Sequence, residues 1–187
     1  MAKSKSGTTK SQPLALELMM GDHRKVEQLF KKYEAEKEAD EDSRQTLAEQ
    51  ICDELTVHAQ VEEELFYPWL RENLSEDKME LVEEAEVEHQ TAKDLIDEIE
   101  GADTVDEAFD AKVKVLSEYI QHHVEEEEDE IFKEVREMKD ELDELGEAMT
   151  ERKAELMEDM GLEEDASPVG RKDSGKASGS GEPRGSR

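Results

Sequence analysis

Residues 47–66, LAEQICDELTVHAQVEEELF, carry the pattern from which the fold can be inferred. Apolar side chains recur every four positions from Leu47 to Leu55, which is the spacing of one face of an α-helix. His58 continues this apolar face, and Glu62 follows it one helical turn later. This stretch therefore predicts an amphipathic helix that points an imidazole and a carboxylate into the protein core.

The same pattern occurs a second time in residues 116–131. There His123-Val-Glu-Glu-Glu127 matches His58-Ala-Gln-Val-Glu62, and acidic and apolar residues follow in both copies. Because acidic residues are so frequent in this chain, one His-xxx-Glu pair alone would be a weak signal. Two copies in matching surroundings indicate an internal repeat.

Each His-xxx-Glu stretch is preceded, at nearly the same distance, by an acidic residue and a histidine. The first pair is Asp22-His23 and the second is Glu88-His89, and both histidines lie on the apolar faces of predicted helices. Two helical hairpins, each with one histidine and one His-xxx-Glu pair, are expected to build a pseudo-twofold site inside a helical bundle.

The whole chain is predicted to be all-α. Helix-forming residues dominate between residues 14 and 160, where Gly and Pro are scarce. Short predicted loops favour an up-down-up-down antiparallel four-helix bundle with an additional C-terminal helix and a disordered tail. The expected parts are a flexible leader (1–12), the bundle (13–140), an extra amphipathic helix (141–160) and the tail (161–187).

Local signals place the expected helix ends. The first helix is predicted to begin near Pro13, and the segment Asp40–Ser43 offers a cap for the second. Pro68 is expected to kink or break the second helix near its end. Ser75 and Thr104 are the expected N-caps of the third and fourth helices, and Thr104 opens a capping-box pattern.

Composition narrows the classes of partner. The 187 residues include 54 acidic and 24 basic ones, which gives a formal net charge of −30. Such a surface repels nucleic acid and anionic lipid, so neither is expected as a partner. One cysteine, Cys52, excludes an internal disulfide. No apolar stretch is long enough to span a membrane, and no secretory signal is recognisable, so we expect a cytoplasmic protein.

The histidines and glutamates of the repeat form a candidate metal site. Four imidazoles and two carboxylates can hold two metal ions, with the carboxylates as bridges, and this donor set suits iron and also manganese or zinc. The alternative is that these residues are ordinary helix residues, which would leave a poorly satisfied polar core. His122 and Glu126 share the His-xxx-Glu spacing, but their face is more polar, so His123 and Glu127 are predicted to be the inner pair.

These motifs together resemble the hemerythrin-like family of HHE cation-binding domains, over roughly residues 14–138. The resemblance implies a four-helix bundle around a non-haem di-iron centre, with two iron ions joined by an oxo or hydroxo bridge. The ligands that it implies are His23, His58, Glu62, His89, His123 and Glu127.

The sequence departs from the family pattern at two positions. Oxygen-carrying hemerythrins have a further histidine one turn after the third-helix ligand, where this chain has Lys93. The proline that often follows the second His-xxx-Glu motif is replaced by Lys133, whereas Pro68 follows the first. The first departure leaves reversible oxygen carriage open, and the second is expected to change only a helix end.

Three functions remain open at this point. The first is a di-iron protein that binds or senses O₂ or handles iron. The second is a di-iron enzyme that reacts with peroxide or nitric oxide. The third is a metal-free acidic helical protein that binds other proteins.

The remaining notable residues are given structural interpretations. Tyr67 and Trp69 are interpreted as packing residues, Cys52 as inert, and the run Glu125–Glu128 as solvated except for Glu127. The sequence identifies no protein partner.

Overall fold

The computed structural model describes residues 12–162, and every regular element in that range is helical. The predicted all-α class is therefore confirmed. The expected tail and nearly all of the expected leader lie outside the described residues. The elements are α1 (Leu14–Ala35), α2 (Glu41–Val61), η1 (Glu62–Phe66), α3 (Tyr67–Asn73), η2 (Glu76–Lys78), α4 (Met79–Glu100), α5 (Glu107–Glu126), η3 (Glu127–Ile131), α6 (Phe132–Val135) and α7 (Lys139–Asp159).

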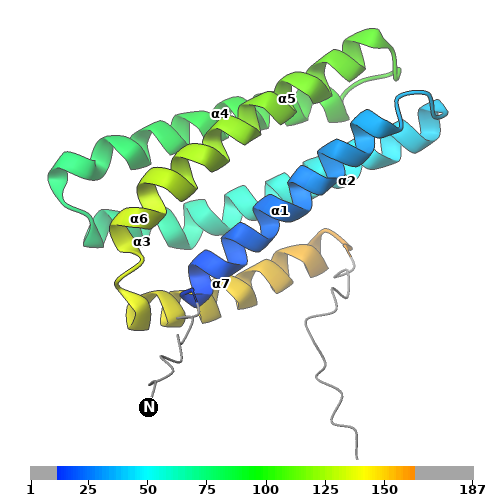
Figure 1. The fold of residues 1–187 in the computed structure, drawn as a ribbon. Helices are drawn as coiled ribbons and strands as arrows, with labels where there is room; N and C mark the ends of the chain where they lie inside the picture. The colour runs from blue at the N-terminus through cyan, green and yellow to red at the C-terminus, as the bar shows by residue number, and fades with distance from the viewer. Residues whose placement is uncertain (1–11, 163–187) are drawn as a thin grey trace, which may run out of the picture.

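Four long helices form the body of the fold. α1 packs against α2, α4 packs against α5, and α2 also contacts α4 (Figure 1). α1 approaches α5 less closely, and a groove of about 800 Å³ runs between them. The helices are amphipathic, so burial of their apolar faces is the main stabilising contribution to this arrangement.

The apolar core consists of two clusters of buried side chains. The first includes Leu16, Phe66, Leu70 and Leu142, and the second includes Phe30, Ile51, Phe109 and Leu116. Along α1, α4 and α5, the buried histidine lies between residues of the first cluster and residues of the second. The fold thus places a polar layer inside an otherwise apolar bundle.

The second and fourth predicted helices each contain a π-helical turn. In the second helix, η1 separates α2 from α3, and in the fourth, η3 separates α5 from α6. Pro68 was predicted to kink or break the second helix; it does not break it, since it lies in the first turn of α3, which continues to Asn73. Proline is not the cause of the π-helical turn, because η3 forms with Lys133 at the equivalent position.

The predicted helix caps are right in part. The Asp40 side chain accepts a hydrogen bond from the Ser43 backbone N–H and caps α2 as expected. Ser75 makes no capping hydrogen bond, and a 3₁₀ turn precedes α4 instead. Thr104 does not cap α5, because Asp106, two residues later, accepts the free N–H groups of the first turn. The sequence patterns therefore located the helix starts to within a few residues, but not the side chain that caps each one.

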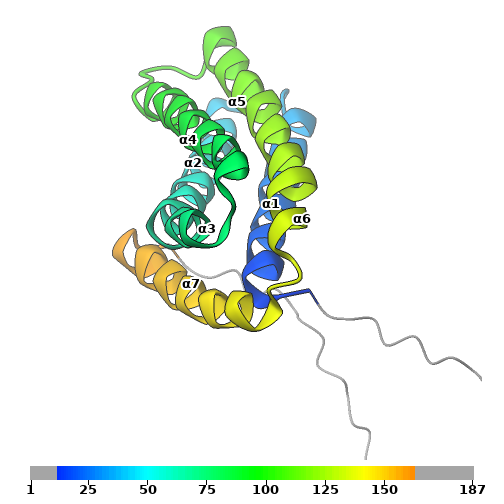
Figure 2. The same cartoon turned by 90° about the vertical axis from the view of Figure 1, so that its left-hand side faces the viewer.

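The additional helix α7 lies across the bundle and packs on α1, α2 and η1 (Figure 2). Gly146 allows this close approach, since a Cβ atom there would lie 2.4 Å from the Ala15 backbone nitrogen. Asp143 of α7 also accepts a hydrogen bond from the Leu14 N–H at the start of α1, at 2.8 Å. α7 is therefore anchored to the first turn of the bundle. None of the described helices is long and apolar enough to cross a membrane.

Candidate metal centre

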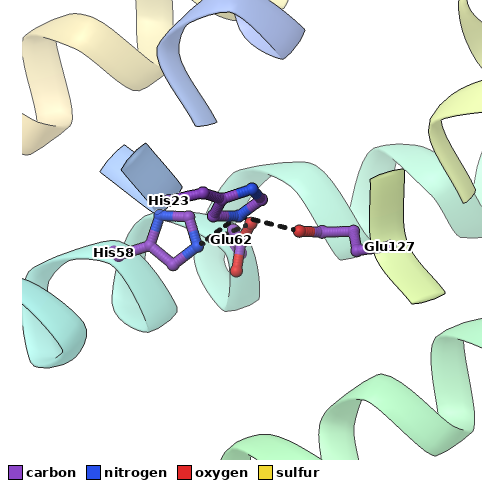
Figure 3. Close-up of side chains that lie close together, drawn as sticks. All are labelled: His23, His58, Glu62 and Glu127. Carbon is purple, nitrogen blue, oxygen red and sulfur yellow. Dashed lines mark hydrogen bonds and ion pairs between the residues drawn. The ribbon is translucent and has the colours of Figure 1, made fainter. Parts of the chain in front are cut away.

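The fold brings the six predicted site residues together in the polar layer. All six side chains are buried, and Glu62 and Glu127 are the most enclosed, with 0% and 1% of their surface exposed. They come from four different helices and the two π-helical turns that follow α2 and α5, and those drawn in the close-up point toward one another (Figure 3). The six are His23, His58, Glu62, His89, His123 and Glu127.

The inward-facing imidazole nitrogens form two pairs. The Nε2 atoms of His23 and His58 are 3.2 Å apart, and those of His89 and His123 are also 3.2 Å apart. Glu62 lies between the pairs, with Oε1 3.2 Å from His58 Nε2 and Oε2 3.3 Å from His89 Nε2. This carboxylate can therefore serve both halves of the site.

The six inner side chains form two groups with the compactness that a metal ion requires. In each group the donor atoms all lie within 4.8 Å of one another. The first group contains His23, His58, Glu62 and Glu127, and the second contains Glu62, His89 and His123. Glu127 Oε2 is 3.2 Å from His23 Nε2. The shared Glu62 gives the two groups one common ligand.

The carboxylates of Glu62 and Glu127 show that this donor set fits a metal. Their four oxygens are fully buried and make no well-aligned hydrogen bond. A buried carboxylate without such a bond is costly, because its hydration is lost without replacement. Metal ions bound by imidazole and carboxylate would satisfy both side chains. The residues present therefore fit a metal centre.

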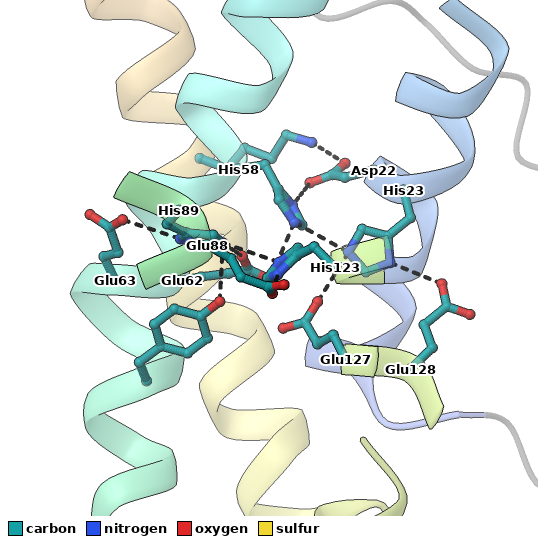
Figure 4. Close-up of polar contacts among 12 residues, drawn as sticks. Asp22, His23, His58, Glu62, Glu63, Glu88, His89, His123, Glu127 and Glu128 are labelled. Carbon is teal, nitrogen blue, oxygen red and sulfur yellow. Dashed lines mark hydrogen bonds and ion pairs between the residues drawn. The ribbon is translucent and has the colours of Figure 1, made fainter. Parts of the chain in front are cut away.

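The outward-facing Nδ1 atom of each histidine has its own carboxylate partner (Figure 4). Such partners fix the tautomer and the orientation of a metal-binding imidazole. The pairs are His23 with Glu128 at 2.9 Å, His58 with Asp22 at 3.5 Å, His89 with Glu63 at 3.1 Å, and His123 with Glu88 at 2.7 Å. The repeat is preserved in this outer layer, since Glu63 and Glu128 match, as do Asp22 and Glu88.

Basic side chains hold three of these four carboxylates. Arg24 donates to Glu128 at 2.6 Å, Lys93 donates to Glu63, and Lys153 of α7 donates to Asp22. Lys93, the position at which oxygen-carrying hemerythrins have a further histidine, therefore supports the partner of His89. The run Glu125–Glu128 was predicted to be solvated except for Glu127. This prediction is wrong for Glu128, because its side chain is only 19% exposed and binds both His23 and Arg24.

Sequence reasoning missed this outer layer almost completely. Asp22 and Glu88 belong to the repeated motif, but the pattern alone assigns them no role. The repeat itself contained a signal for this layer. In each half an acidic residue, Asp22 or Glu88, directly precedes a candidate histidine ligand. A second acidic residue, Glu63 or Glu128, directly follows the candidate glutamate ligand. Lys153 lies far away in the sequence, and only the packing of α7 brings it to Asp22.

The π-helical turns position the two carboxylates. η1 begins at Glu62 and η3 begins at Glu127, so each turn starts on the last residue of a His-xxx-Glu pair. A π-helical turn inserts one extra residue and rotates the following side chains relative to a regular α-helix. The following residues also contribute to the site, since Glu63 and Glu128 bind the Nδ1 atoms of His89 and His23.

Tyr67 makes the two halves of the site unequal. Its hydroxyl lies 3.1 Å from His89 Nε2, on the inward side of that ring, and the side chain is completely buried. The matching residue in the other half is Phe132, whose ring stacks on His23 with centroids 6.1 Å apart. The interpretation of Tyr67 as a packing residue is therefore incomplete, because its hydroxyl lies against a candidate ligand.

Burial and pairing shift the pKa values of the inner groups in opposite directions. Burial opposes charge on His23, but Glu127 and Glu128 beside its two ring nitrogens raise the pKa of His23 to about 10. Burial and the nearby charge of Glu127 raise the pKa of the Glu62 carboxyl to about 8. The pKa of Glu127 is lowered to about 2 in spite of burial, because the neighbouring His23 imidazole favours its ionised form. Without metal, the site therefore retains protons near neutral pH.

A small cavity lies beside the imidazoles. Its volume is about 30 Å³, its walls are almost entirely apolar, and His23, His58, His89 and His123 all line it. A cavity that holds one water needs roughly 10–15 Å³, so this space can hold a molecule of a few atoms. His23 also lines the groove between α1 and α5, so the centre is close to the surface on that side.

The match to a family of known proteins agrees with this geometry. The family described as Hemerythrin HHE cation binding domain matches residues 14–135. A protein named DNA nickase from Nostoc sp. (strain PCC 7120) is 33% identical over 116 residues, which are 62% of this chain and 31% of that protein. The chain thus spans about a third of the length of this relative. No solved structure gives a significant match.

Proposed function

This chain belongs to the hemerythrin HHE cation-binding family, and we propose that it holds two iron ions and binds a small ligand such as O₂. The bundle would follow the up-down-up-down topology that the short loops favour. The observation that carries the proposal is the shared carboxylate of Glu62 between two pairs of imidazole nitrogens.

The donor atoms are compatible with iron. One ion would be held by His23, His58, Glu62 and Glu127, and the other by Glu62, His89 and His123. Mixed imidazole and carboxylate donors suit iron, although the same set also binds manganese and zinc. Bound iron would supply a redox-active centre with a coordination position for a small molecule.

The chain's own residues would select the ligand by size and polarity. The apolar cavity of about 30 Å³ beside the four imidazoles would suit a small ligand such as a diatomic molecule or peroxide. The outer carboxylates keep each Nε2 atom pointed inward, so the centre is organised before a ligand arrives. These features support a role in binding or sensing O₂, or in handling iron.

An enzyme that reacts with peroxide or nitric oxide is the second candidate, and Tyr67 is the observation that favours it. A buried phenol beside one candidate ligand supplies a proton donor in one half of the centre only.

Two other functions are disfavoured. A metal-free interaction protein would leave both inner carboxylates buried without well-aligned hydrogen bonds. DNA nicking, which the name of the relative states, is disfavoured for this chain, since a net charge of −30 opposes contact with phosphates.

The deciding experiment is anaerobic loading of the full chain with Fe²⁺, followed by metal analysis and optical spectra before and after exposure to air. We expect about two irons per chain and new near-ultraviolet and visible bands. Bands that reverse when O₂ is removed would support reversible binding, and irreversible oxidation would favour sensing, iron storage or peroxide chemistry. No bound iron and no spectral change would overturn the proposal.

A double variant, His58→Ala with His123→Ala, tests the assigned ligands. It removes one imidazole from each half, so metal content and melting temperature should fall together, because a bound metal stabilises the folded state. The control is Glu125→Gln, which changes an exposed side chain that lies outside the inner centre. Equal inner-centre metal content in the double variant and in the unmodified chain would contradict the assignment.

A further inference from the structure

A second, outer group of potential ligands lies next to the inner centre. It consists of Glu88 on α4 with His122 and Glu126 on α5, and their donor atoms lie within 4.8 Å of one another. His122 Nε2 is 3.2 Å from Glu126 Oε1 and 4.0 Å from Glu88 Oε1. We call these three residues the outer cluster.

The outer cluster runs from solvent toward the interior. The His122 side chain is 59% exposed, Glu126 is 36% exposed and Glu88 is 10% exposed. A hydrated cation can therefore reach His122 and Glu126 first, and the buried carboxylate of Glu88 lies deeper. One imidazole and two carboxylates form a donor set that suits divalent transition metals.

Glu88 connects the outer cluster to the inner centre. Its Oε1 atom faces His122, and its Oε2 atom accepts a hydrogen bond from Nδ1 of the inner residue His123 at 2.7 Å. A small cavity of about 10 Å³ is lined by Glu88 and Glu126 of the outer cluster and by His123 and Glu127 of the inner centre. The Glu127 carboxylate, which lines this cavity, is buried without a well-aligned hydrogen bond.

The other half of the repeat has no equivalent arrangement. The positions that match His122 and Glu126 are Val57 and Val61, both buried and apolar. The position that matches Glu88 is Asp22, which is paired with Lys153 of α7. Glu88 instead lies against two imidazoles, those of His122 and His123. The pseudo-twofold symmetry is thus broken where a cation could enter.

We propose that Glu88, His122 and Glu126 form an outer divalent-cation site that receives metal ions and passes them to the inner centre. The binding of a cation by the outer cluster stands on this geometry alone. The delivery of that cation rests on the proposed function, because it requires an inner metal centre. Negative charge around the cluster would also raise the local concentration of cations.

The test is titration of the metal-free full chain with Co²⁺. Equilibrium dialysis counts the bound ions, and the visible absorption of Co²⁺ follows their binding. We expect two tightly bound ions and a third, weaker one. His122→Ala and Glu126→Gln should each lower the affinity for the third ion by about tenfold or more, and should leave the affinity for the two tight ions unchanged. The matched control is Glu125→Gln, which removes the same charge one residue away and should leave all three ions in place.

Loading kinetics test the delivery role. At Co²⁺ concentrations that do not saturate the outer cluster, His122→Ala and Glu126→Gln should slow loading of the inner centre by about tenfold. The final number of tightly bound ions should not change, and Glu125→Gln should load at the normal rate.

The outcomes separate the two proposals. Identical ion numbers and affinities in His122→Ala and the unmodified chain would overturn the outer site. Loss of the third ion with an unchanged loading rate would overturn delivery. Absence of the two tight ions in the unmodified chain would instead overturn the proposed function, while a weak ion that His122→Ala abolishes would still support the outer site.

Discussion

The hydroxyl of Tyr67 lies 3.1 Å from Nε2 of His89, and both side chains are buried in the polar layer of the bundle. Nε2 is the atom with which His89 would bind a metal ion, so the phenol oxygen lies at the edge of the same coordination space. The matching Phe132 offers no oxygen to His23. The two halves of the repeat are therefore chemically different at this position.

Tyr67→Phe removes this oxygen without changing the shape of the core. We expect the metal-free variant to lose about 0.5–1.5 kcal/mol of unfolding free energy, the usual contribution of one hydrogen bond. Iron content should remain near two per chain, and the visible spectrum of the iron-loaded protein should change. Tyr33→Phe is the control, because its hydroxyl donates to Asp110 at 2.7 Å and lies outside the inner centre. A spectrum of the Tyr67 variant identical to that of the control would show that the phenol has no influence on the metal.

Lys153 connects α7 to the inner centre through Asp22. Burial opposes ionisation of Asp22, but His58 and Lys153 together lower the pKa of that carboxyl. Lys153→Met removes the basic partner of Asp22, so Asp22 should orient the His58 imidazole less firmly. The metal affinity of the group that contains His58 should fall by about tenfold, as measured by Co²⁺ titration.

Arg152→Met is the matched control for Lys153. Arg152 is the adjacent residue on α7 and pairs with Glu64, whose side chain is 39% exposed and takes no part in the inner centre. Breaking this exposed pair should change stability little, because solvent and salt screen it, and should not alter metal affinity. Equal metal affinities in the two variants would show that α7 does not support His58.

Gly146→Ala tests the close packing of α7 on α1. The added methyl group would meet backbone and Cβ atoms of Leu14 and Ala15 at 2.4–2.8 Å, so α7 must move away. We expect a loss of about 1–3 kcal/mol, the usual cost of overpacking. Thermal unfolding followed by circular dichroism measures the change.

Gly21→Ala should act in the opposite direction. Gly21 also lies in a helix, but nothing stands within 4 Å of a Cβ atom built there. Alanine stabilises a helix interior by about 0.5–1 kcal/mol relative to glycine. If both variants shifted the melting temperature in the same direction, the contact of Gly146 with α1 would not be the controlling factor.

The metal-free protein should become less stable as the pH rises. His23 has its pKa raised from 6.5 to about 10, and Glu62 has its pKa raised from 4.5 to about 8. The folded state therefore binds more protons than the unfolded state over this range, so unfolding free energy falls with increasing pH. The loss due to Glu62 should occur between pH 4.5 and 8, and that due to His23 between pH 6.5 and 10.

Metal should reverse this dependence. A bound ion displaces the protons of His23 and Glu62, so loading releases protons and strengthens as the pH rises. Melting temperatures measured from about pH 6 to 10, with chelator and with metal, should diverge increasingly. A metal-free melting temperature that stays constant across this range would contradict the assigned protonation, and Glu62→Gln should flatten the slope.

The helical class and the six residues of the inner layer could be predicted from the sequence. Helix periodicity places side chains four positions apart on one face, so His58 with Glu62 and His123 with Glu127 were expected to point inward together. That these residues bind metal remains a prediction. The π-helical turns could not be predicted, because they depend on how each carboxylate meets helices that are distant in the sequence.

The contacts that complete the site follow from the packing of the helices. Packing places Glu62 between two imidazole pairs, gives every outward Nδ1 atom a carboxylate, and brings Tyr67 to His89. It also brings Lys153 to Asp22 from a helix beyond the residues that match the family. Periodicity alone cannot supply these contacts, because it specifies only the face on which a side chain lies. The partner of that side chain depends on the distance and rotation between packed helices, which the whole core sets.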